Sequence, residues 1–267
     1  MSRLRTGESV LSRAVRILEA FSPGESALGV SEIARRAGLH PATASRLIAE
    51  LSEHGLLARS ADRRVRIGAR MQELAARAVP ARSLRDAALP FMRDAHAVIG
   101  HHVQLGVPDG REVLFLERLS APRAVVNFAR VAGRLPLHAS SGGLVLLAHG
   151  PHELQESVLA APLARFTAHT IVSSQRLRAV LAEVRREGCA SCPGHVHEDA
   201  LEIAVPVRAG TGPGPVVAAL AAIVPVTANG QAVAGILTAA ARGISRTIGG
   251  NTSPALSLYA NAYIGSA

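Results

Sequence analysis

The chain contains no lysine, no tryptophan and only two cysteines, Cys189 and Cys192. Two cysteines this close together cannot form the disulfide framework that stabilises small secreted domains. No apolar run approaches the roughly 18 residues of a membrane-spanning helix. The first residues carry charges but are not followed by the apolar stretch of a secretion signal. We therefore expect a cytoplasmic protein.

Aromatic residues are also scarce, at 3% of the 267 residues, so the core must be built from Ala, Val, Leu and Ile. Hydrophobic residues make up 48% and charged residues 18%, which is a globular and not a disordered composition. The length is comfortable for two domains.

All 29 basic residues are arginines, and they are unevenly distributed. Residues 1–85 hold 15 arginines and eight acidic residues, a net charge of +7, whereas residues 86–267 hold 14 arginines and 12 acidic residues, a net charge of +2. The excess in the first third indicates a polyanionic partner, and we expect it to be double-stranded DNA.

The N-terminal third predicts a helix-turn-helix. Apolar residues at helical spacing predict a helix over residues 9–21, and a short strand is expected at residues 28–30. Ser31 is expected to cap a helix over residues 32–37 that ends at Gly38. Pro41 suits the first position of a second helix, which reaches residue 54. This arrangement is typical of a helix that enters the major groove.

The second helix opens with small side chains, which allow its backbone to approach the DNA closely. Two short strands at residues 56–59 and 65–67 flank a polar hairpin that would form a basic wing on the phosphate backbone. The alternative is a helical hairpin with a solvated basic face. The residues that we expect to contact DNA are His40, Ala42, Thr43, Ser45, Arg46, Arg63 and Arg64.

The rest of the chain mixes helices and strands and contains no internal repeat. We expect helices at residues 69–78, 84–99, 140–148, 153–159, 174–187 and 229–248, and strands at 103–107, 113–119, 124–128, 201–208 and 216–224. The pattern predicts an α+β domain behind the DNA-binding segment.

Several segments resemble the IclR (isocitrate lyase regulator) family. They are residues 9–21 (SVLSRAVRILEAF), residues 31–39 (SEIARRAGL), residues 133–140 (GRLPLHAS) and residues 203–207 (IAVPV), in one collinear order. The resemblance implies a winged helix-turn-helix domain (9–68), a linker helix (69–83), a GAF-like α+β effector-binding domain (84–250) and a tail (251–267). It also implies a homodimer or tetramer that acts on palindromic operators as a repressor or activator.

In this family, small organic or aromatic acids bind near the helix that follows the His-Ala-Ser segment. Backbone N–H groups at a helix N-terminus suit a carboxylate. The alternative is an ordinary capped helix, with Glu202 facing outward from its strand. By the resemblance, the effector-binding residues are Ala124, Ser141, Gly142, Cys192, Ala200, Glu202 and Ala221.

A second function is left open by the cluster Cys189, Cys192, His195 and His197, which could serve a metal- or redox-sensing regulator. Zinc sites usually pair two ligand turns about a dozen residues apart, so this tight cluster argues against a metal. The alternative without a special function is that these four residues form a loop and part of the wall of the effector pocket. No cofactor is expected.

A catalytic module fused to a DNA-binding domain is the third possibility. The glycines of residues 210–214 lie between two strands with prolines among them, which does not suit a phosphate-binding loop, and no Gly-x-Ser-x-Gly motif occurs. We therefore expect a ligand-responsive transcriptional regulator and not an enzyme.

Overall fold

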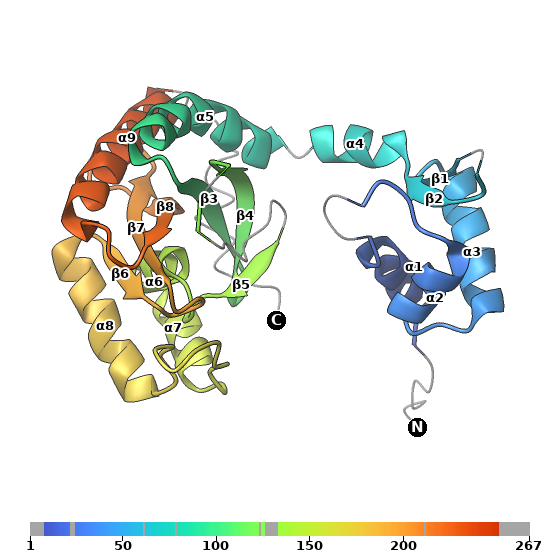
Figure 1. The fold of residues 1–267 in the computed structure, drawn as a ribbon, viewed down its shortest axis with the longest axis horizontal. Coiled ribbons are helices and arrows are strands. Elements are labelled where there is room, and N and C mark those ends of the chain that lie inside the picture. The colour runs from blue at the N-terminus through green and yellow to red at the C-terminus, as the bar shows by residue number, and fades with distance from the viewer. Residues whose placement is uncertain are drawn as a thin grey trace. The chain divides into compact units, whose positions relative to one another are not determined.

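The computed structural model describes residues 8–21, 25–60, 62–77, 79–122, 124–125, 133–210 and 212–250 (Figure 1). Its contacts divide the chain between residues 78 and 79 into an N-terminal and a C-terminal unit. The expected strand at residues 126–128 and the tail 251–267 lie outside the described residues.

The N-terminal unit is a winged helix-turn-helix. Ser9 caps the first helix by accepting the N–H of Ser12, and Pro41 begins the third, as its fixed φ favours. A two-stranded antiparallel sheet follows as the wing, and apolar side chains of the first three helices and of both wing strands form one core. The elements are α1 (Val10–Glu19), α2 (Val30–Arg36), α3 (Pro41–Glu53), β1 (Leu57–Arg59), β2 (Val65–Ile67) and α4 (Ala69–Ala76).

Two sequence predictions in this unit are wrong. The expected strand at residues 28–30 is a single β-bridge, in which Leu28 and Val65 exchange hydrogen bonds of 2.8 Å, because the chain turns into α2 directly afterwards. Ser31 is not the cap: Gly29 holds the extended N-cap conformation, so that Ser31 lies inside α2.

The C-terminal unit is built on a six-stranded antiparallel sheet with the order β5-β4-β3-β8-β7-β6. The long hairpins pair almost along their full length, and β6 pairs only with the first half of β7. The strands are β3 (His102–Asp109), β4 (Glu112–Leu119), β5 (Arg134–Pro136), β6 (Ala190–Pro193), β7 (Ala200–Arg208) and β8 (Val216–Pro225).

Helices cover both faces of this sheet and complete an α+β domain of three layers (Figure 1). One face packs against α5 and α9, and the other against α6, with α8 outside it. Gly188 ends α8 at φ 71°, a conformation that glycine adopts without strain. The helices are α5 (Val79–Ile99), α6 (Ser141–His149), α7 (His152–Leu159), α8 (Ser174–Glu187) and α9 (Gly230–Gly250).

Four details differ from the sequence prediction. Helix α5 begins at Val79 and not at residue 84, so it takes up the end of the expected linker. Ala124 and Val125 do not form a strand. Strands β5 and β6 were not predicted, because each has only three or four residues and is held by pairing with a longer strand.

Candidate functional site

Helix α3 presents a polar face to solvent on the side opposite its buried residues. Ser45 and Arg46 are exposed, Thr43 is half-buried, and Ala42 is exposed in the first turn. His40 is the N-cap, and its Nδ1 accepts the N–H of Ala42 at 3.4 Å. The predicted contact residues of this helix therefore lie at and near its N-terminal end, where a recognition helix meets the bases.

The wing carries the other two predicted residues at its tip. Arg63 has φ 62°, the one positive φ of a non-glycine residue among those the structure describes. The hairpin is closed by the N–H of Ser60 and the N–H of Arg63, which bond to the carbonyl groups of Arg64 and Ser60 at 2.9 and 3.0 Å. Both arginines are exposed, so the turn projects two cations from a tight support.

The arginines of α2 are ion-paired within the chain, whereas, among the described residues, those of α3 and the wing tip are not. Arg35 pairs with Glu32 at 2.7 Å, and Arg36 pairs with Glu32 at 2.6 Å. By contrast, Arg46 and the two wing arginines form no ion pair with any described residue. Helix α3 and the wing thus carry unpaired positive charge that phosphates would neutralise.

In the C-terminal unit, the start of α6 meets a carboxyl group from the sheet. Ser140 caps the helix by accepting the N–H of Gly143 at 3.2 Å, and the N–H of Ser141 donates to Oε2 of Glu202 at 3.2 Å. The hydroxyl oxygen of Ser141 is buried without a partner, and no acceptor for the Gly142 N–H is found in the described part of the chain. This helix start retains donors that a ligand can use.

Strand register brings most of the predicted effector-binding residues to this same face of the sheet. Cys192 pairs directly with Glu202, and Ala221 pairs with Ala204, the next residue of β7 on that face. A Cβ at Gly142 would lie 3.7 Å from the Ala219 Cβ, which fixes α6 against β8. Ala200 is buried two residues before Glu202. Ala124 is half-buried in the segment that follows β4 and belongs to no strand.

Glu202 does not face outward, as the alternative interpretation held. Its side chain is buried, and burial raises the pKa of its carboxyl to about 7, although the hydrogen bond from Ser141 acts in the opposite direction. Burial, followed by the nearby Glu202 charge, raises the pKa of the Cys192 thiol well above its ordinary value. The thiol is therefore protonated at neutral pH and a poor nucleophile.

Sequence reasoning missed two polar residues on this face, His102 and Gln104 of β3. Both are buried. His102 and Glu202 both pair with Ile223 of β8, and Gln104 pairs with Ala221. The His102 ring bonds to the hydroxyl of Ser120 at 3.0 Å and to the carbonyl oxygen of Val125 at 2.6 Å. Their polarity within a strand was visible in the sequence, but only the register shows which residues they neighbour.

The cysteine–histidine cluster does not assemble into a metal site. Within the described ranges, no group of three or more His, Cys, Asp or Glu side chains is placed to hold a metal ion. Cys192 lies on β6 and points into the core, whereas Cys189 is only half-buried just before that strand. Both cysteines are free thiols.

The match to family models identifies this architecture. The IclR helix-turn-helix domain matches residues 10–61, and the C-terminal domain of bacterial IclR transcriptional regulators matches residues 76–246. The chain belongs to the IclR family. It is a DNA-binding transcriptional regulator, and its relatives are regulators and not enzymes. None of the described helices is long and apolar enough to cross a membrane.

Individual IclR proteins resemble the chain over most of its length. The regulator XynR of Escherichia coli is 28% identical over 199 residues, which are 74% of this chain and 79% of XynR. An IclR homologue from Microbacterium hydrocarbonoxydans, solved in complex with 4-hydroxybenzoate, is 44% identical with a TM-score of 0.83, over 90% of this chain and 99% of that one. The IclR structure of Thermotoga maritima shares the fold at 24% identity and a TM-score of 0.71, over 90% and 98%.

Proposed function

We propose that this IclR regulator responds to a small organic or aromatic acid that binds between the start of α6 and the polar face of the sheet. The observation that carries the proposal is the 44% identical homologue in complex with 4-hydroxybenzoate, which has both an aromatic ring and a carboxylate. The buried Ser141 hydroxyl and the Gly142 N–H supply donors for such a carboxylate.

Glu202 sets the chemistry of this binding. Its carboxyl already accepts the first N–H of α6, so an acidic ligand placed there would meet a negative charge unless Glu202 is protonated. A pKa of about 7 makes protonation accessible near neutral pH. Binding of an acid at this site should therefore be accompanied by proton uptake, and its affinity should fall as the pH rises above 7.

Calorimetric titration with 4-hydroxybenzoate tests the site. Ser141→Ala removes a hydroxyl group that has no partner in the structure, so it should weaken binding without loss of stability. Gly142→Leu should abolish the effect of the acid on DNA binding and leave DNA binding without it intact. Gly235→Leu is the control, because that glycine is exposed on α9 with open space around it. Normal binding by both site variants would place the effector elsewhere.

On DNA, we propose that Thr43 and Arg46 contact bases and that Arg63 and Arg64 contact phosphates, with His40, Ala42 and Ser45 at the same interface. Arg46→Ala should cost about 1–3 kcal/mol and relax the preference at one base position. Arg63→Ala should weaken binding to all sequences alike and reduce its salt dependence. Anisotropy titrations with the intergenic DNA beside the regulator's own gene would measure both. If Arg46→Ala distinguishes operator from random DNA as the native protein does, the assignment of α3 is wrong.

We further propose a cytoplasmic homodimer or tetramer on two-fold symmetric operators, since one such domain makes too few base contacts for useful specificity. Helix α1 offers a surface for a second copy, because Val10, Leu11 and Val15 are 51%, 74% and 42% exposed. Leu11→Asp should reduce self-association and operator affinity together. Sedimentation that shows only monomer at micromolar concentration, with and without DNA, would contradict this proposal.

A further inference from the structure

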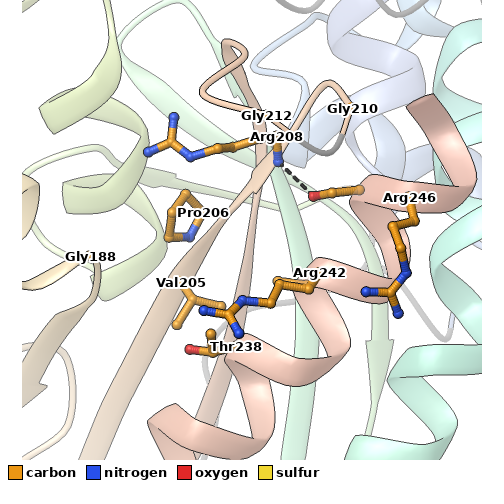
Figure 2. A pocket seen from close by; sticks show the side chains of 11 residues that line it. Gly188, Val205, Pro206, Arg208, Gly210, Gly212, Thr238, Arg242 and Arg246 are labelled. Carbon is orange, nitrogen blue, oxygen red and sulfur yellow. Dashed lines mark hydrogen bonds between the residues drawn. The ribbon is translucent and has the colours of Figure 1, made fainter.

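A hollow lies in the C-terminal unit between β7 and α9, and the residues at the start of α6 do not line it. It has a volume of about 340 Å³, which falls within the range of small-molecule sites. Its wall is formed by the second half of β7, by one side of α9 and by Gly188 at the end of α8. Figure 2 shows this hollow with the side chains around it.

Three arginines line the hollow, and none of the described residues that line it is acidic. They are Arg208 of β7 and Arg242 and Arg246 of α9. Some other arginines of the unit are ion-paired, as in Arg178–Glu156 at 2.8 Å and Arg134–Asp109 at 2.7 Å. The three arginines of the hollow form no ion pair within the described ranges.

Hydrogen bonds hold Arg208 in place, through both its backbone and its side chain. The Arg208 N–H donates to the Ser245 hydroxyl oxygen at 3.0 Å, and one guanidinium nitrogen of Arg208 donates to the Gly214 carbonyl oxygen at 3.0 Å. In Figure 2 the side chains of Arg208 and Arg242 extend to the same side, around Pro206, and that of Arg246 extends to the opposite side. Two guanidinium groups therefore flank the space, and the third contributes charge from the other side of α9.

The edge of β7 beside the hollow has few free hydrogen-bonding groups for another strand, but it leaves room for a small molecule. Strand β6 pairs only as far as Ala204, so β7 from Val205 onward has no neighbour on that side within the described structure. Pro206 removes one N–H from this edge, and the N–H of Arg208 is already bound to Ser245. The edge thus offers a peptide strand little to bond with.

The positive charge of Arg208 also acts on His149 of α6. Burial, followed by the charges of Arg208 and Arg185, lowers the pKa of His149 to about 4. His149 is therefore neutral at physiological pH, and it adds no third charge to the two arginines. The chain tolerates several cations here without a counter-charge of its own.

We propose that this hollow binds a small doubly charged anion of the phosphate type, as inorganic phosphate or as a phosphate ester, between Arg208 and Arg242. A guanidinium group offers parallel N–H donors that match the oxygens of a phosphate, and two such groups balance its two negative charges. Val205, Pro206 and Ala241 supply apolar surface against which the remainder of an ester can lie. The site is independent of the acid effector at α6.

Calorimetric titration of the full-length protein with inorganic phosphate, and separately with glucose 6-phosphate, tests this proposal at constant ionic strength set by sodium chloride. Arg242→Gln should weaken binding of the phosphate group at least tenfold, and because Arg242 is exposed the substitution should leave the fold intact. Arg208→Gln should do the same, and Arg246→Gln should have a smaller effect. Arg165→Gln is the control, because this exposed arginine lies in the segment between α7 and α8.

Tighter binding of the ester than of inorganic phosphate would assign the site to phosphorylated metabolites, and equal binding would assign it to the free ion. The proposal is overturned if phosphate gives no more heat than chloride at equal ionic strength. It is also overturned if Arg242→Gln binds as tightly as Arg165→Gln. A changed sedimentation mass for Arg242→Gln with unchanged phosphate affinity would instead make the arginines a contact between subunits.

Discussion

Glu202 should make the C-terminal unit less stable as the pH rises, and Glu202→Gln should remove this contribution. The pKa of its buried carboxyl is about 7, against an ordinary value of 4.5. Since one pKa unit corresponds to about 1.4 kcal/mol, the ionised carboxylate costs the folded state about 3 kcal/mol. The folded chain binds this proton more tightly than the unfolded chain does, so the free energy of unfolding falls as the pH rises from about 4.5 to about 7.

Glu202→Gln keeps the size of the side chain and an oxygen that can accept the Ser141 N–H, but it has no charge at any pH. We expect the variant and the native protein to differ by no more than about 1 kcal/mol at pH 5. At pH 8 the variant should be more stable by about 3 kcal/mol. Urea denaturation of both full-length proteins at pH 5, 6, 7 and 8, followed by far-UV circular dichroism, measures this difference.

The difference in unfolding free energy between the two proteins cancels the contribution of the other groups that titrate between pH 5 and 8. Burial lowers the pKa of several histidines of the same unit, including His102 and His138, but they are present in both proteins. Glu198→Gln provides the matched control, since Glu198 is exposed. If the difference between Glu202→Gln and the native protein is the same at pH 5 and pH 8, the carboxyl is not desolvated in solution and the reasoning fails.

Three further predictions concern the same region. Gly143→Ala should destabilise the fold by about 1–3 kcal/mol, because its Cβ would lie 2.3 Å from a backbone oxygen. Gly142→Ala should cost little, and urea denaturation of both variants measures the difference. Equal losses of stability would contradict the geometry. A thiol reagent should modify Cys189 in the native protein and Cys192 only after unfolding; rapid modification of Cys192 would show that β6 opens. Glu202→Gln should bind 4-hydroxybenzoate more tightly than the native protein at pH 8 and about equally at pH 5, by calorimetry; a constant ratio would remove Glu202 from the effector site.

Local sequence signals predicted the helices whose first or last residue is marked by a proline or a glycine. Helix α3 has a proline at its first position, and α8 ends at a glycine in the left-handed conformation, so periodicity and end signals agree for both. The same logic failed at α2, where Ser31 is a good cap by residue type but Gly29 takes the position. Capping preference is worth only about 1 kcal/mol, and the packing of a helix can shift its start by a residue or two.

Strand pairing and register could not be predicted from local sequence. Strand β6 is four residues long and exists because it pairs with the first half of β7, so its segment had the composition of a loop. Strand β7 is buried along most of its length on both faces, and it therefore lacks the alternation that shows which side chains face which helix. For that reason the sequence left the orientation of Glu202 open and did not connect it with His102 or Gln104, which the register places on the same face.

The two faces of the sheet differ in the polar groups that they bury. The face toward α5 and α9 is built from an apolar cluster of Val, Leu, Ile and Ala side chains. The face toward α6 instead contains His102, Gln104 and Glu202, together with the unpartnered hydroxyl of Ser141. A buried carboxyl and a buried hydroxyl without a partner both lower stability, and an apolar residue in either place would avoid that cost. Such costs are typical of functional sites, which supports our proposal that the acid effector binds at this face and gives the Ser141 hydroxyl a partner.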